Sequence, residues 1–170
     1  FLEVLFTPYR IINSDFDLLY RPVFQLADEV AHYNNYKAVQ SIAGMVFEKY
    51  KYLFKETPAQ VEDIRKYGYA PKQLHHMIRC HDFLIKYISG RSYVDCLKVN
   101  NAEELIKIKR GLLPYKEAMA TAKFMYEDTI RFKELYMQNV PLKISESVKE
   151  ILQNCLINIF KKHFSKQIGV

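Results

Sequence analysis

One segment, residues 71–90, constrains the fold more than any other part of the chain. It reads PKQLHHMIRCHDFLIKYISG and begins with proline, whose fixed φ angle and missing N–H suit the first turn of a helix. Gly90 follows the last apolar residue, where helices commonly end. The apolar side chains recur every three or four residues, which predicts a core-facing stripe of Leu74, Ile78, His81, Ile85 and Ile88, widened by Met77 and Leu84. We therefore expect an amphipathic helix here.

The same helical periodicity runs along most of the chain and breaks where proline or glycine occurs. It predicts further helices over residues 14–34 with a break or restart at Pro22, 36–54, from 58, 102–109, 114–138 and 145–163. Residues 92–99 are expected to be irregular, and only residues within 1–8 have the pattern of a strand. We therefore predict an all-α, multi-helix bundle of about six to seven helices with one short N-terminal strand. It would be a single domain over residues 1–170, with its helical part at 14–165.

The composition indicates the environment of the chain but says little about its chemistry. Cys80, Cys96 and Cys155 are an odd number without paired spacing, which suits a reducing compartment, so we expect a cytoplasmic protein. No apolar run approaches the roughly 18 residues of a membrane-spanning helix. The net charge of +6 and the pI of about 9.1 suit an anionic partner, and they equally suit a basic surface that serves solubility alone.

Residues 14–17, Ser-Asp-Phe-Asp, have the order in which many nucleotidyltransferases carry their metal-binding carboxylates. Two-metal nucleotidyl transfer needs both carboxylates on one strand and an upstream Gly-Ser turn whose N–H groups hold the triphosphate. No glycine precedes Asp15, and on a helix Asp15 and Asp17 would point about 200° apart. We therefore interpret Ser14 as a helix N-cap followed by acidic first-turn residues, and we assign no metal site.

The helix predicted at residues 71–90 also carries a row of basic side chains. Lys72, His76 and Arg79 follow one another at spacings of four and three residues and therefore project from one side. Arginine offers bidentate geometry to a phosphate, and lysine offers a point charge. The row predicts a phosphate contact, while an ordinary solvated helix face remains the alternative. The most polar strip of this helix contains His75, Arg79, Asp82 and Lys86.

Two further interpretations of this helix concern metal binding and catalysis. His76 and Cys80 are four residues apart and could share a metal ion, yet no second pair with ligand spacing follows, which disfavours zinc. His81, on the apolar stripe, is more typical of a hydrogen-bonded core histidine than of a catalyst. Neighbouring helical positions also give a cysteine and a histidine poor mutual geometry for nucleophilic catalysis. We therefore predict no catalytic residue in this chain.

Three stretches together resemble a known family: FLEVLFTPYRIIN, PKQLHHMIRCHDFLIKYISGRSY and LIKIKRGLLPYKEA. They resemble the C-terminal half of predicted nucleotidyltransferases of the DNA polymerase β superfamily, known from phages and from bacterial RNA-repair gene clusters. The resemblance covers residues 1 to about 125. It matches a strand pattern at Glu3, Leu5, Phe6 and Pro8, a Lys-x-x-x-His-x-x-Arg helix at Lys72, His76 and Arg79, and the end of a short helix at Arg110 and Gly111.

This resemblance implies Mg²⁺-dependent transfer of a nucleotide from a nucleoside triphosphate (NTP) to an acceptor, for which RNA is one candidate. The family's carboxylates would precede Phe1, so the resemblance implies that the chain is inactive by itself and has an N-terminal catalytic domain as its partner. The strand within residues 1–8 would belong to the sheet of that domain, and without it would fold back on the helices or mediate a homodimer. The chain would be the helical, substrate-side portion, with Lys72, His76 and Arg79 on phosphate and His75, Lys86 and Arg110 as accessory contacts.

Two other classes of function remain open. A stand-alone helical module could bind RNA or another anion without metal and with a steep salt dependence, since phosphate contacts release counterions. A helical protein-interaction domain could use its 13 Tyr and 11 Phe for partner contacts, and loss of Arg79 would then leave anion affinity unchanged. A second concentration of basic residues, which either extends a phosphate track or is a solvated surface, comprises Lys98, Lys107, Lys109, Arg110 and Lys116.

Overall fold

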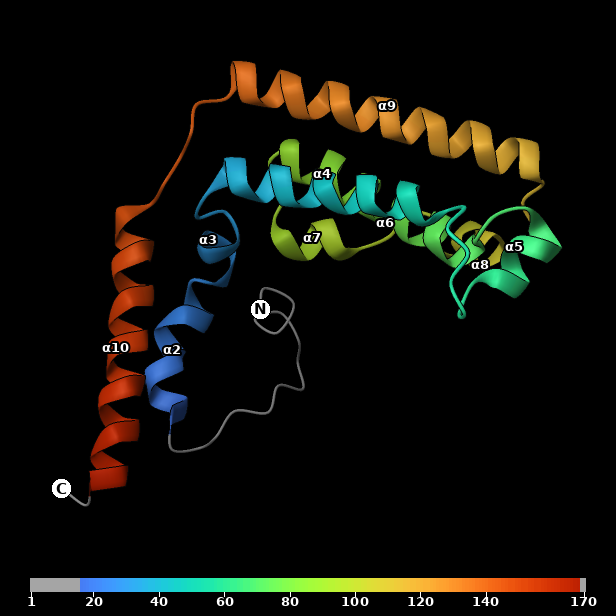
Figure 1. Cartoon of the computed structure of the whole chain (residues 1–170). Helices are drawn as coiled ribbons and strands as arrows, with labels where there is room; N and C mark the ends of the chain where they lie inside the picture. The colour runs from blue at the N-terminus through green and yellow to red at the C-terminus, as the bar shows by residue number, and fades with distance from the viewer. Residues whose placement is uncertain (1–15, 169–170) are drawn as a thin grey trace. The chain divides into compact units, whose positions relative to one another are not determined.

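The computed structural model describes the backbone of residues 16–168 and the side chains as far as Ser165 (Figure 1). Over this range the protein is all-α, which confirms the predicted fold class. The only extended pairing within these residues is an isolated antiparallel bridge between Asn34 and Ile144. The short strand predicted within residues 1–8, and Asp15 of the Ser-Asp-Phe-Asp stretch, lie outside the described residues.

Nine helices follow one another in the described part of the chain. They are α2 (Asp17–Gln25), α3 (Ala27–Ala31), α4 (Asn35–Tyr52), α5 (Val61–Tyr67), α6 (Pro71–Ile88), α7 (Tyr93–Leu97), α8 (Ala102–Lys109), α9 (Tyr115–Asn139) and α10 (Glu146–Ile168). Pro22 lies inside α2, and the predicted break comes at Leu26 instead. The number of helices exceeds the expected six to seven because α3 separates from α2 and because α7 forms as well.

Helix α7 forms within residues 92–99, which the periodicity predicted to be irregular, because a side chain caps its first turn. The Ser92 hydroxyl accepts a hydrogen bond from the Asp95 N–H at 3.2 Å and donates one to the Asp95 carboxylate at 2.8 Å. Ser-x-x-Asp is an N-terminal helix signal that this prediction overlooked. Helix α5 likewise begins at Val61 and not at Pro58, after a turn in which the Gln60 N–H bonds to the Thr57 carbonyl oxygen.

The described helices belong to two compact units. The smaller unit joins the segment that ends at Asn35 to the segment that begins at Leu142, and the larger unit is Tyr36–Pro141. In the smaller unit, three valines from α2, α3 and α10 are buried together: Val23, Val30 and Val148. Asp17 lies in the first turn of α2, as predicted, and pairs with Arg21 at 3.8 Å on the exposed surface. The N-cap of α2 is Phe16, without a side-chain cap, and not the predicted Ser14.

In the larger unit, α6 packs against α7, α8 and α9. Its side chains Leu74, Met77 and Leu84 are fully buried. They share two hydrophobic clusters with residues of α4, among them Val46 and Val39. Of the predicted apolar stripe, Leu74 and His81 are buried, as are Met77 and Leu84 beside it, whereas Ile78, Ile85 and Ile88 are only half-buried. Ile78 and Ile85 line a cavity beside α9.

Both ends of α6 follow from the residues at those positions. Pro71 occupies the first turn, where no intrahelical partner for its N–H is needed. At the other end Gly90 adopts a φ of +76°. The Gly90 N–H donates a hydrogen bond to the Tyr87 carbonyl oxygen at 3.0 Å, and the Arg91 N–H donates one to the Lys86 carbonyl oxygen at 3.2 Å. These two hydrogen bonds provide donors for carbonyl groups in the last turn, which have no partner within the helix.

Candidate functional site

The predicted row of basic residues lies on α6 with its side chains in different environments. Lys72 and Arg79 are exposed, and His76 between them is half-buried. The half-buried ring of His75 stands edge-on to that of His76, with the ring centroids 5.2 Å apart. The row therefore presents two exposed cations on either side of a partly enclosed imidazole.

Two neighbouring helices add cations to this row. Burial is the largest cause that lowers the pKa of His76, followed by the charges of Lys49 on α4, Arg79, Lys72 and Lys109 on α8. Burial also lowers the pKa of His75, with further contributions from His76, Arg79 and Lys109. Positive groups from α4, α6 and α8 thus act on His76, and those from α6 and α8 act on His75 as well. We call Lys49, Lys72, His75, His76, Arg79 and Lys109 the basic cluster.

The positive charge of the basic cluster is poorly compensated. In the described residues, Lys72, Arg79 and Lys109 form no ion pair, and Lys49 pairs only with the adjacent, exposed Glu48 at 3.3 Å. The Nδ1 atom of His75 is buried without a hydrogen-bond partner in the same part of the chain. Because like charges repel, such a concentration is unfavourable unless an anion balances it.

The donor set of the basic cluster fits a phosphate and does not fit a metal ion. Arginine, lysine and neutral imidazole can donate hydrogen bonds to phosphate oxygens, whereas Mg²⁺ requires anionic oxygen ligands. Across residues 16–168, no three His, Cys, Asp or Glu side chains come together in a way that could hold a metal. Burial raises the pKa of the Cys80 thiol, against smaller opposite effects of Lys49 and Arg79, so Cys80 does not supply a thiolate beside His76.

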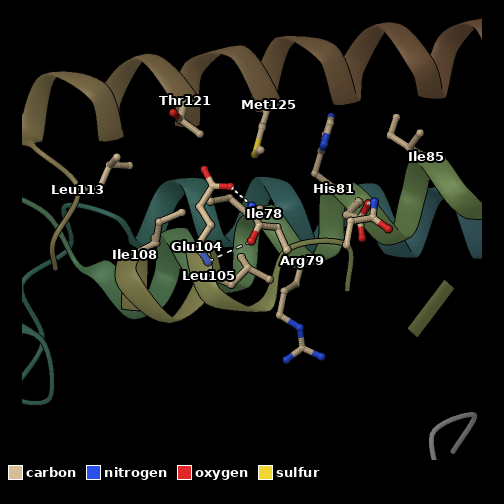
Figure 2. Close-up of a pocket in the computed structure, with 13 residues that line it drawn as sticks. Ile78, Arg79, His81, Ile85, Glu104, Leu105, Ile108, Leu113, Thr121 and Met125 are labelled. Carbon is tan, nitrogen blue, oxygen red and sulfur yellow. Dashed lines mark hydrogen bonds between the residues drawn. The ribbon is translucent and has the colours of Figure 1, made fainter. Parts of the chain in front are cut away.

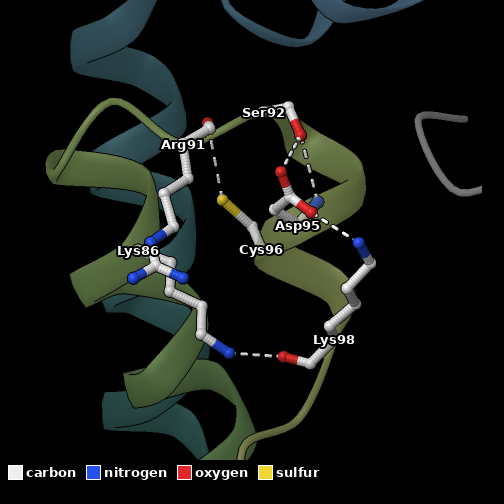
Figure 3. Close-up of polar contacts among 6 residues, drawn as sticks. All are labelled: Lys86, Arg91, Ser92, Asp95, Cys96 and Lys98. Carbon is white, nitrogen blue, oxygen red and sulfur yellow. Dashed lines mark hydrogen bonds and ion pairs between the residues drawn. The ribbon is translucent and has the colours of Figure 1, made fainter.

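Lys86, predicted as an accessory contact, lies away from the basic cluster. Its side chain is buried, and its ammonium group donates to the Asp82 carboxylate at 2.6 Å and to the carbonyl oxygen of Lys98 just after α7 (Figure 3). Arg110, the other predicted accessory residue outside α6, is exposed at the end of α8 and does not contribute to the pKa shifts of the histidines. Of the accessory residues, the structure brings only His75 into the cluster.

His81 has the environment predicted for a core histidine. It is buried, and its Nε2 atom lies 3.0 Å from Oδ2 of Asp128 on α9. The other carboxylate oxygen of Asp128 accepts a hydrogen bond from Arg131 at 2.5 Å. This network ties α6 to α9 and keeps the buried carboxylate paired.

Lys49 is the member of the basic cluster that the sequence did not indicate. It lies in the last turn of α4, where basic residues are favoured at any helix end. Lys109 was recognised only as part of a second basic concentration. Lys49 and Lys109 come near His76 because of the way α4 and α8 pack against α6. Residue spacing within α6 cannot predict that packing.

The lowered histidine pKa values predict a loss of stability in mild acid. A histidine whose pKa is lower in the folded than in the unfolded chain takes up a proton on unfolding, so acid favours the unfolded state once the pH falls below the ordinary value of 6.5. We expect the free energy of unfolding to decrease as the pH falls from about 7 towards 5. Urea titrations at several pH values should show a smaller decrease in a His75→Gln/His76→Gln variant; an unchanged decrease would assign the effect to other groups.

Comparison of the chain with known protein families, with curated proteins and with solved structures gives no match. None of the helices within residues 16–168 combines the length and apolarity needed to cross a membrane.

Proposed function

We propose that the basic cluster binds the phosphates of a nucleotide, and that Tyr36–Pro141 serves as the helical, substrate-side portion of a polymerase-β-like nucleotidyltransferase. The observation that carries the proposal is that cations from α4, α6 and α8 act on His76, while Lys49, through the adjacent Glu48, is the only one of Lys49, Lys72, Arg79 and Lys109 with an ion pair in the described residues. Lys72, His76 and Arg79, the residues on which the family resemblance rests, form the α6 part of this cluster.

The roles of the cluster residues follow from their chemistry. Arg79 offers two parallel N–H groups to one phosphate, and the flexible Lys72 and Lys109 neutralise charge around it. His76, kept neutral by burial and by the surrounding cations, donates a hydrogen bond without adding to the repulsion between them. Mg²⁺ would supply charge neutralisation and leaving-group activation in the complete enzyme, and its carboxylate ligands are not among the residues of this cluster.

The proposal predicts that Lys72→Gln/Arg79→Gln weakens binding of inorganic triphosphate and of ATP by about thirtyfold, because two charge-assisted contacts are lost. Isothermal titration calorimetry at low ionic strength measures both affinities. A matched control is Lys123→Gln/Arg65→Gln, which removes the same two charges from exposed positions on α9 and α5 outside the cluster. We expect less than a threefold loss there, since distant surface charges act only through the overall field.

Three outcomes separate the functional classes. Equal losses in both double variants, or no loss in either, would contradict a phosphate site and leave the cluster as a solvated surface. Tighter binding of ATP than of triphosphate supports a nucleotide site. If single-stranded RNA binds far more tightly than ATP, with a steep salt dependence, the stand-alone nucleic-acid-binding module replaces the nucleotidyltransferase portion.

A further inference from the structure

A cavity of about 380 Å³ lies between α6, α8 and α9 in the larger unit (Figure 2). Its walls are mainly apolar, with Ile78 and Ile85 from α6, Leu105 from α8 and Met125 from α9. Volumes of this order and predominantly apolar walls are typical of sites for small molecules. Arg79 of the basic cluster also lines this cavity, but its guanidinium group extends away from α9 while His81 extends towards it (Figure 2).

One polar group in the cavity wall has unused hydrogen-bonding capacity. His81 is 9% exposed and lines the cavity, and its Nε2 atom faces the carboxylate of Asp128 at 3.0 Å. Because a carboxylate accepts, Nε2 carries the hydrogen, and Nδ1 of the neutral ring remains as an acceptor. Nδ1 has no partner among the described residues and does not belong to their fully buried polar atoms. Nδ1 is therefore not fully enclosed by the described residues.

The carboxylates around the cavity already have partners, among them Glu104, which accepts a hydrogen bond from Asn101 at 2.6 Å, and this favours a neutral ligand. Asp128 is paired with His81 and Arg131, and Asp82 is paired with Lys86 and accepts a further hydrogen bond from Asn100 at 2.9 Å. Arg79 also lines the cavity and forms no ion pair in the described residues, but its guanidinium group extends away from α9 (Figure 2). A charge buried among the apolar side chains would therefore lose its hydration without a nearby counterion. The thioether of Met125 favours an aromatic ring, since sulfur makes stabilising contacts with ring edges.

We infer that this cavity binds a small, neutral aromatic molecule that carries one hydrogen-bond donor. The ring lies among Ile78, Leu105 and Met125, and the donor bonds to Nδ1 of His81. The inference does not rest on phosphate binding, because it uses other side chains and another direction of access.

Indole and indene test the inference on the full chain, because the two molecules have nearly the same shape and only indole has an N–H. Titrations followed by nuclear magnetic resonance should perturb backbone amides of α6, α8 and α9 around the cavity. We expect indole to bind about fivefold more tightly than indene, the difference that one hydrogen bond makes. Lys72→Gln should leave the indole affinity unchanged.

A cavity-filling variant provides a second test of indole binding. Thr121 of α9 lines the cavity, so Thr121→Phe should remove indole binding, whereas Lys123→Phe, on the exposed side of the same helix, should not. The inference is overturned if neither molecule binds up to its solubility limit, if the perturbed amides lie elsewhere, or if Thr121→Phe retains full affinity. Equal affinities of indole and indene would also overturn it, because His81 would then play no part.

Discussion

Replacing Lys86 with alanine should lower the free energy of unfolding by about 3 kcal/mol, although phosphate affinity should not change. The Lys86 side chain is 6% exposed and that of Asp82 is 27% exposed, so the alanine variant leaves a largely buried carboxylate without its cation. It also leaves the carbonyl oxygen of Lys98 without a donor. Urea titration followed by circular dichroism measures the loss of stability, and calorimetry with triphosphate measures the affinity.

Two comparisons make the Lys86 result specific. Lys98→Ala removes an exposed lysine that pairs only with Asp95, and we expect a loss below about 1 kcal/mol. Lys86→Met/Asp82→Asn replaces the ion pair by neutral groups and should recover part of the stability. If Lys86→Ala instead weakened triphosphate binding as much as Lys72→Gln/Arg79→Gln and left stability unchanged, Lys86 would be a phosphate contact as the resemblance implies.

Replacing Gly111 with alanine should lower the free energy of unfolding by about 3 kcal/mol. Gly111 ends α8 with a φ of +74°, and its N–H bonds to the Ile108 carbonyl oxygen at 2.9 Å. A Cβ atom there would lie 2.5 Å from two ring carbons of Tyr67, which packs against the core cluster of the larger unit. The variant therefore combines a left-handed alanine with a clash that has to displace a packed ring.

Gly90 is the matched control for this substitution. It ends α6 with a φ of +76°, yet an added Cβ would meet no atom within 4 Å. Gly90→Ala should therefore show only the backbone strain, about 1 to 2 kcal/mol. Equal losses at the two glycines in urea titrations would mean that Tyr67 moves away without cost, which would contradict this prediction.

Most of the candidate site on α6 was accessible from the sequence. The spacing of Lys72, His76 and Arg79 places them on one side of a helix, and Pro71 and Gly90 mark where that helix begins and ends. The spacing could not show which of Arg79 and Lys86 is exposed, because the two residues lie two turns apart on the same polar strip. In the folded chain Arg79 is exposed, whereas Lys86 is covered by the end of α7.

The sequence by itself determined the helices, because proline and glycine dihedral limits, side-chain caps and apolar periodicity act within a few residues of the chain. Only the tertiary structure decided which charges meet. Lys49, His76 and Lys109 come together because α4, α6 and α8 pack side by side, and the cavity beside His81 exists because α9 spans α6 and α8 without filling the space between them. Contacts of this kind join residues far apart in the chain, and the shape and packing of whole helices select them.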